Sequence, residues 1–293
     1  MAQARLSVFV LWAILVSGCG SSSPVAPEST TPGTTVPSGT WKGAFQITSC
    51  TGALDISTCQ SGPESFVLRL GSAGGVLQID TKIWQAAPPI AVDVAVRPGA
   101  GATILSGSSA ASRNLDVQLT LSDAGTGLQG TVQYAVDGIG ARLIKQGRIM
   151  FANRDQTVYP ARFEGQWVGF VTRTQCSGDC SDSDAVLPAG AARLLLSQAG
   201  SGISGALNGH DLTGTATGSS FNATGRFAVA ASACRRQFDS GMNCLVELSV
   251  SATADAFDRL HGSITYRVEG VDDRGRPFAL SASGTLEGLA RWP

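Results

Sequence analysis

Few side chains in this sequence are of the kind that carries out chemistry. The two histidines, His210 and His261, belong to neither a His-Glu-x-x-His nor a Gly-x-Ser-x-Gly motif. A nucleophile needs a base that is itself held by a third group, and no such arrangement can be recognised around either histidine in the sequence. We therefore expect both to be surface or strand-end residues, and we expect a protein that is not an enzyme and has no catalytic residue.

An acidic loop is the best place for a metal ion. Asp179, Asp182 and Asp184 fall within six residues, and carboxylate oxygens are ligands that calcium prefers. The loop lacks the central glycine and the distal glutamate of an EF-hand. We expect a solvated loop with no metal and no cofactor, with calcium as the alternative.

Cysteine chemistry divides the seven cysteines into one and six. Cys19 stands alone near the N-terminus, and the other six form three locally spaced pairs. In an oxidising compartment an even number of cysteines favours disulfides over free thiols. A zinc ribbon would need two close pairs near each other, and these pairs are far apart in sequence. The spacing predicts disulfides Cys50–Cys59, Cys176–Cys180 and Cys234–Cys244.

The N-terminus has the pattern of a secretory signal. Arg5 precedes an uncharged apolar run over residues 6–16, which is 11 residues long. A helix that crosses a bilayer needs about 20 apolar residues, so this run is too short for an ordinary membrane span. A short positive stretch, a short apolar core and small residues after it predict export.

The small residues resemble a more specific signal. Leu15-Val16-Ser17-Gly18-Cys19 resembles the lipobox of bacterial lipoproteins, whose cysteine thiol receives a diacylglycerol and becomes residue one after cleavage. The resemblance implies a signal peptide over 1–18 and acyl chains such as palmitate on Cys19, which hold the protein on membrane lipid. Gly20, in place of Asp, favours the outer membrane. Residues 19–38 are rich in Ser, Thr, Pro and Gly, which is typical of a flexible linker.

Composition limits the fold and the partners. The 21 Lys and Arg are balanced by 22 Asp and Glu, which leaves no basic surplus for binding nucleic acid. With 36 glycines and 43% hydrophobic residues, the chain has short alternating stretches of Val, Ile, Thr and Ser, and no long segment has a 3.6-residue apolar period. This is typical of an all-β protein.

The chain contains an internal duplication. Gly39-x-Trp41-x-Gly43 matches Gly165-x-Trp167-x-Gly169 at an offset of 126, and the match continues through Cys50 and Cys176. Later segments correspond after small insertions, as in 128–134 and 260–266. We predict two copies of one module, over 39–155 and 163–293, each of common domain size.

Each copy contains eight strand-like segments. In the first copy Leu115, Val117, Leu119 and Leu121 alternate with polar residues, which is typical of an antiparallel sheet with one buried face. Eight such strands can close into a small up-and-down barrel, and a two-sheet sandwich is the alternative. The predicted strands of the first copy are 41–47, 65–70, 76–81, 90–96, 102–106, 114–121, 128–136 and 142–151.

A second resemblance concerns the ends of each copy. Gly-x-Trp in the first strand, with an arginine near the end of the last, resembles the lipocalin and avidin (calycin) superfamily of β-barrels. In that superfamily the tryptophan plugs the closed end of the barrel and the arginine lies against it. The resemblance implies two tandem eight-stranded antiparallel barrels, with barrel plugs Trp41–Arg154 and Trp167–Arg291.

These expectations lead to three functional hypotheses. The first is a membrane-anchored envelope lipoprotein that binds a small apolar ligand in a barrel mouth, or an envelope protein or glycan through its loops. The second is a structural or protease-inhibitor-like surface protein. An enzyme ranks last, because no acid–base pair or nucleophile can be nominated.

Mass spectrometry of the protein purified from the membranes of its host tests the predicted cleavage before Cys19 and the lipid attachment. We expect a chain that begins at Cys19 and carries the mass of acyl groups, with three disulfides. A chain that keeps residues 1–18, or an unmodified thiol at Cys19, would contradict the lipobox assignment.

Overall fold

The computed structural model describes most of both predicted copies. The described residues are 36, 38–52, 62–81, 89–99, 101–109, 115–123, 127–137, 141–178, 190–229, 244–271 and 275–293. They form strands and no helix, so no described helix could span a membrane. The prediction of an antiparallel all-β fold is confirmed.

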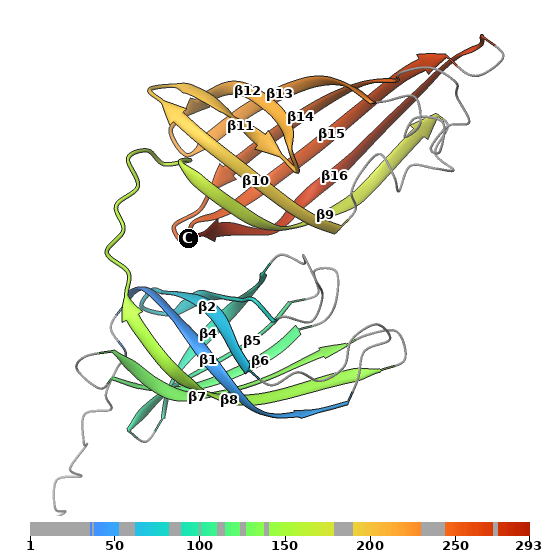
Figure 1. The fold of residues 1–293 in the computed structure, drawn as a ribbon. Coiled ribbons are helices and arrows are strands. Elements are labelled where there is room, and N and C mark those ends of the chain that lie inside the picture. Colours follow the sequence, from blue (N-terminus) through green and yellow to red (C-terminus); the bar gives the residue numbers. More distant parts are fainter. Residues whose placement is uncertain are drawn as a thin grey trace, which may run out of the picture. The chain divides into compact units, whose positions relative to one another are not determined.

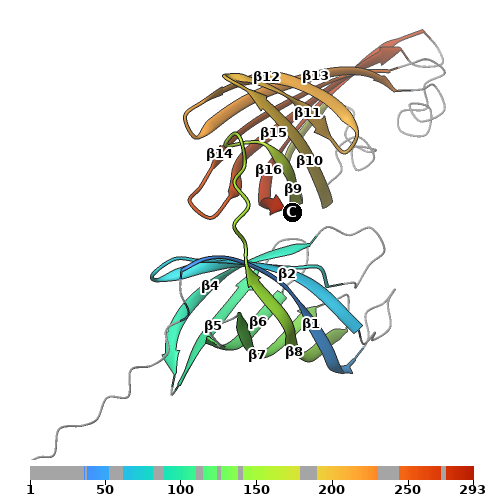
Figure 2. The same cartoon turned by 60° about the vertical axis from the view of Figure 1, so that its left-hand side comes forward.

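The first eight strands form a closed antiparallel barrel, here called the first barrel. Each strand pairs with the next one in sequence, and β1 also pairs with β8. Figure 1 and Figure 2 both show β1, in blue, running beside β8, in green. The strands are β1 (Gly39–Thr51), β2 (Gly62–Leu70), β3 (Gly74–Ile79), β4 (Ile90–Gly99), β5 (Ala102–Ser109), β6 (Leu115–Asp123), β7 (Leu128–Asp137) and β8 (Arg142–Arg154).

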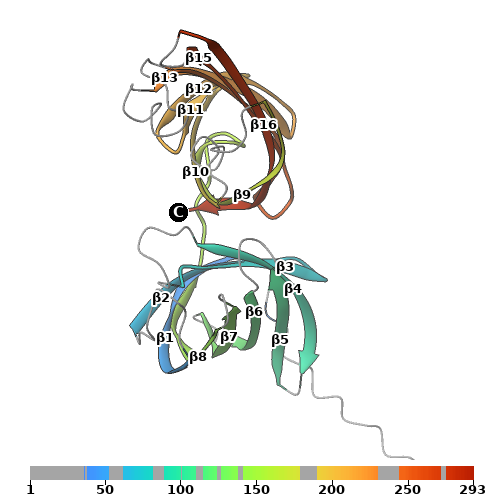
Figure 3. The same cartoon turned by 90° about the vertical axis from the view of Figure 1, so that its right-hand side faces the viewer.

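The last eight strands, here called the second sheet, have the same neighbour order. Every strand is antiparallel to the next, and β9 pairs with both β10 and β16. Figure 3 shows β9 and β16 side by side in a curved ring of strands. The strands are β9 (Gly165–Gly178), β10 (Gly190–Ala199), β11 (Gly202–Leu207), β12 (His210–Thr217), β13 (Ser220–Val229), β14 (Cys244–Ala254), β15 (Arg259–Val271) and β16 (Pro277–Trp292).

The predicted alternation of buried and exposed residues is confirmed on β6. Leu115, Val117, Leu119 and Leu121 are buried, while Asp116, Gln118 and Thr120 are exposed. Because side chains alternate across a strand, the buried set faces the barrel interior and the polar set forms its outer face. The same pattern recurs on β14, where Val246, Leu248 and Val250 are buried.

Strand registers place the duplicated residues in equivalent positions. Trp41 pairs with Leu68 on one side and Arg154 on the other. Trp167 pairs in the same way with Leu194 and Arg291. The sequence offset of 126 thus holds for the tryptophans and their leucine partners. The arginine partners lie farther apart in the sequence because of the small insertions in the later segments.

Some predicted strands are too short. The sequence prediction ends one strand at Val96 and begins the next at Ala102, but β4 continues to Gly99 and pairs Pro98 with Thr103. Arg97-Pro98-Gly99 has the composition of a turn. The ladder continues through it because proline lacks only a donor and can still accept a hydrogen bond.

Gly43, the second glycine of the repeated motif, lies where β1 and β8 approach closely. A methyl group added to its Cα would lie 2.2 Å from the carbonyl oxygen of Phe151 and 2.8 Å from the ring of Phe66. Both contacts are far inside van der Waals distance, so any side chain at position 43 would push the two strands apart.

Replacing this glycine therefore tests barrel closure. We expect Gly43→Ala to lower the free energy of unfolding by about 1–3 kcal/mol, the usual cost of overpacking, as measured by urea denaturation. Thr120→Ala, on the exposed face of β6, serves as the control and should change it by less than about 0.5 kcal/mol. Equal stability of the two variants would contradict the close approach.

Candidate functional site

The described cysteines lie near strand ends. Cys50 is the second-last residue of β1, Cys176 lies near the end of β9, and Cys244 begins β14. Cys19, Cys59, Cys180 and Cys234 lie outside the described residues, as does the acidic loop with Asp179, Asp182 and Asp184, so the lipid attachment, the three pairings and the empty acidic loop stay predictions.

The structure brings together the tryptophan and arginine predicted to plug the second copy. The Arg291 guanidinium lies 4.4 Å from the centre of the Trp167 ring and 3.9 Å from that of Tyr159. It also donates hydrogen bonds to the backbone carbonyls of Arg162 and Glu164. Trp167 Nε1 donates to the carbonyl of Phe163 at 3.1 Å. Cation–π attraction and the backbone hydrogen bonds together hold this end of the second sheet in place.

The corresponding pair in the first copy has different surroundings. Trp41 is buried and is the register partner of Arg154. Arg154, however, is exposed and donates a hydrogen bond to the carbonyl of Ser38 at 2.9 Å. The two predicted plugs thus share their strand positions but not the environment of the arginine.

The histidines lie on the second sheet. His210 stacks on Phe227, with ring centres 3.8 Å apart. His261 Nε2 lies 3.0 Å from Asp255 Oδ2, and Arg259 Nε donates to the same oxygen at 2.9 Å. Burial would raise the pKa of Asp255, but hydrogen bonds from His261 and from two backbone amides lower it below its usual value. These contacts fit a carboxylate that organises the turn before β15.

Sequence reasoning missed a buried polar cluster inside the first barrel. Lys145 Nζ on β8 donates to Glu64 Oε1 on β2 at 2.5 Å and to the carbonyl of Thr81 at 2.9 Å. The Tyr134 hydroxyl on β7 donates to the other oxygen of Glu64. Glu64, Lys145 and Tyr134 are at most 2% exposed. We call these three residues the interior triad.

Burial dominates the electrostatics of the triad. Loss of solvent raises the pKa of Glu64 above its usual value, although the hydrogen bonds from Lys145 and Tyr134 act in the opposite direction. Burial and the neighbouring Glu64 charge likewise raise the pKa of Tyr134. A buried ion pair of this kind costs more to desolvate than an apolar pair of the same volume.

At the matching described positions, the second copy has no ion pair. Tyr134 pairs with Lys145, and the matching Tyr266 pairs with Ala282. Glu64 pairs with Phe45, and at the matching register Gly190 pairs with Val171. Alanine and glycine thus replace the lysine and the glutamate.

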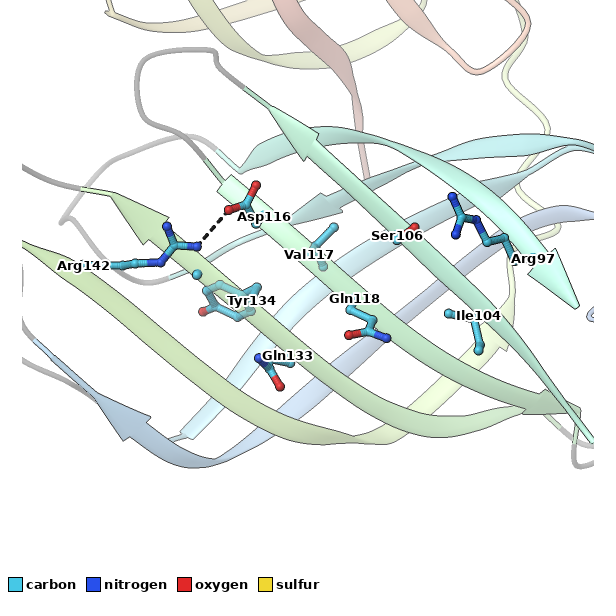
Figure 4. A pocket seen from close by; sticks show the side chains of 10 residues that line it. Arg97, Ile104, Ser106, Asp116, Val117, Gln118, Gln133, Tyr134 and Arg142 are labelled. Atoms are coloured by element: carbon cyan, nitrogen blue, oxygen red, sulfur yellow. Dashed lines mark hydrogen bonds and ion pairs between the residues drawn. The ribbon is translucent and has the colours of Figure 1, made fainter. Parts of the chain in front are cut away.

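The outer face of the first barrel is hollowed over β4–β8 and β1. One hollow of about 540 Å³ lies around Gln118 and is bordered by Arg97, Ile104 and Arg142. Figure 4 shows Gln118 and Gln133 beside each other on neighbouring strands of this face. A second hollow of about 450 Å³ shares both glutamines and extends to Thr48 on β1. We call the two hollows together the outer groove.

Three glutamines form a row across the centre of the outer groove. Gln118 pairs with Gln133, and Gln133 with Gln146. Gln146 Nε2 donates to Gln133 Oε1 at 3.2 Å. All three side chains are exposed. We call this row the amide ladder, since each member presents a donor and an acceptor at the surface.

The charges at one end of the groove are largely compensated. Arg142 contacts Asp116 at 2.8 Å and Asp137 at 3.0 Å, and Figure 4 marks the first of these contacts. Exposed pairs of this kind add little stability. Because positive and negative side chains lie side by side there, that end of the groove is polar but is not dominated by charge of one sign.

The amide ladder was not recognised from the sequence because its members are far apart in it. The spacing between them becomes meaningful only when the registers of β6, β7 and β8 are known. In the second sheet the same register positions hold Ser249, Thr265 and Ser283. The second copy therefore has short hydroxyl side chains where the first has long amides.

Comparisons with known proteins add little to this geometry. No family model and no curated protein matches the chain. A candidate outer membrane protein from Bacteroides fragilis is 11% identical, with 87% of this chain and 97% of that chain covered and a TM-score of 0.22. A DUF3598 family protein of unknown function from Nostoc punctiforme is 10% identical, with 87% and 96% covered and a TM-score of 0.20. Similarity at these TM-scores carries no argument about this chain.

The interior triad can be tested by a set of substitutions. We expect Lys145→Met alone to lower the free energy of unfolding by about 3–5 kcal/mol, because it leaves the Glu64 carboxylate buried without its partner. Replacing the whole triad (Glu64→Leu, Lys145→Met, Tyr134→Phe) should recover most of this loss, because the second copy tolerates an interior without the ion pair.

Urea denaturation of the full chain measures both effects. Arg142→Ala, which removes an exposed pair, is the control and should cost less than about 1 kcal/mol. A triple variant as unstable as Lys145→Met would show that the triad does not act as a unit.

Proposed function

We propose that this chain is an exported lipoprotein, cut before Cys19 and held on the outer membrane by acyl chains, that binds an envelope partner through the outer groove. In this proposal the protein is not an enzyme. Its two halves are copies of one lipocalin-like barrel module, and the first half carries the binding surface.

The equivalence of the strand registers supports the duplicated barrel. Trp41 and Trp167 occupy matching ladder positions, and each is flanked by a leucine and an arginine. In the second sheet β9 pairs with β10 on one side and with β16, the last strand, on the other. A ring of this kind leaves no unpaired edge that could aggregate outside the cell.

The contents of the first barrel favour its outer face over its interior as the binding surface. Phe45 and Phe66 stack inside the barrel with ring centres 4.2 Å apart. The interior triad connects β2, β7 and β8 across the same space. An apolar ligand in the barrel would have to displace these rings or face a buried ion pair, and both are costly.

The outer groove is the single observation that carries the proposal. It combines two adjoining hollows, of about 540 and 450 Å³, with exposed polar side chains that no strand or loop among the described residues covers. Hollows of this size are within the range used for ligand binding. A tether at Cys19 would keep this face close to the polymers and proteins of the envelope.

Photocrosslinking in the host tests the proposal. Thr120, on the rim of the groove, is replaced by benzoylphenylalanine, and the matching Ser251 on the second sheet is replaced in a separate strain. We expect a crosslinked adduct from position 120 that depends on Cys19, so that Cys19→Ala reduces its yield several-fold. Absence of an adduct at position 120, or equal adducts at 120 and 251, would contradict binding through the outer groove.

A further inference from the structure

The composition of the outer groove identifies the kind of molecule that fits it. Most of its polar side chains are amides and hydroxyls: Thr48, Ser106, Gln118, Thr120, Thr131, Gln133 and Gln146. Such groups donate and accept hydrogen bonds at the same site, as the hydroxyls of a sugar do. We propose that the outer groove binds a neutral oligosaccharide and that the side-chain amides of the amide ladder form hydrogen bonds with the hydroxyls of the sugars.

The dimensions of the groove favour a chain of sugars over a single one. The two hollows run from Arg97 on β4, across β5 to β8, to Thr48 on β1. Measured around the curved wall of the barrel, five strand spacings correspond to about 24 Å. Because Gln118 and Gln133 line both hollows, a ligand that fills the groove passes over the amide ladder.

The charges at the Arg142 end of the groove favour a neutral ligand over an anionic one. Arg142 is engaged by Asp116 and Asp137. An acidic polysaccharide would have to compete with these carboxylates for Arg142 and would meet their repulsion. A neutral chain meets no such repulsion.

The same face is poorly suited to an extended peptide. A peptide that adds to a sheet needs a free strand edge, and the first barrel has none because β1 pairs with β8. A peptide lying across the strands would need apolar pockets for its side chains. Of the apolar residues that line the first hollow, Val117 and Ala135 are buried and Ile104 is half-buried.

The second sheet provides the matched substitutions. Ser249, Thr265 and Ser283 stand at the ladder positions in the second copy. The variant Gln118→Ser, Gln133→Thr, Gln146→Ser therefore shortens each amide to a side chain that an equivalent strand already carries. The shorter side chains extend less far from the sheet towards a ligand, while the surface of the groove stays polar.

The test measures binding of the purified, lipid-free mature chain to defined probes. The probes are neutral oligosaccharides of glucose, mannose, galactose, xylose and N-acetylglucosamine from two to eight units, beside acidic oligosaccharides of galacturonic acid and a set of unrelated peptides. We expect at least one neutral series to bind, with affinity that rises with length and then levels off. Binding should change little between low and high salt.

The ladder variant should weaken that binding by about tenfold or more, since three hydrogen-bonding groups are shortened. The variant Ser249→Ala, Thr265→Ala, Ser283→Ala on the second sheet is the control and should leave it unchanged. Thermal unfolding checks that each variant is folded. If the ladder variant does not fold, the single change Gln133→Thr at the centre of the row is used in its place.

This inference rests on the proposed function, and the two can fail separately. Binding of no neutral series, binding only to galacturonic acid oligomers or peptides, or binding that survives the ladder variant would overturn the glycan assignment. If position 120 still crosslinks to a discrete protein in the host, the outer groove remains a binding surface with a different partner. If position 120 gives no adduct, the proposed function itself fails.

Discussion

The pairing of β1 with β8 is the constraint on which the first barrel depends. It closes the ladder, so that every strand has two neighbours. Closure needs two register shifts in this pair, next to Ala44 and Ile47, and a glycine at position 43 where Phe151 approaches. Because the ring is closed, alternate side chains have only two possible locations: the packed interior, or an outer face that is free to carry a groove.

Much of this architecture could be predicted from the sequence, because it follows from local patterns. The alternation of Leu115 to Leu121 with polar residues predicts β6 and its buried face, and the repeated Gly-x-Trp-x-Gly predicts the duplication. The turn-like residues Arg97 to Gly99 misled the prediction because pairing with β5 outweighs local preference.

The polar features could not be predicted, since they depend on contacts between distant segments. Period-two alternation puts Lys145 on the same face as Leu143, but its partner Glu64 is 81 residues away. A lysine in a strand is normally solvated, so its burial becomes visible only when the partner is known. The amide ladder is the same problem on the outer face, because three glutamines align only through two strand registers.

The two copies show how one backbone can carry different chemistry. The first copy keeps a buried ion pair and long surface amides, and the second has alanine, glycine and short hydroxyls at the matching positions. A buried ion pair is seldom the most stable choice for a core. The two halves therefore differ both inside and outside, although their strand ladders keep the same register.

The register of the terminal strands has an evolutionary consequence. Trp41 near the start of the first copy pairs with Arg154 at its finish, and Trp167 pairs with Arg291 in the second. A unit whose two chain ends are neighbours can be duplicated, deleted or spliced into another gene without cutting through a strand ladder. Such a unit is suited to growth by tandem copying, after which one copy is free to acquire a new specificity.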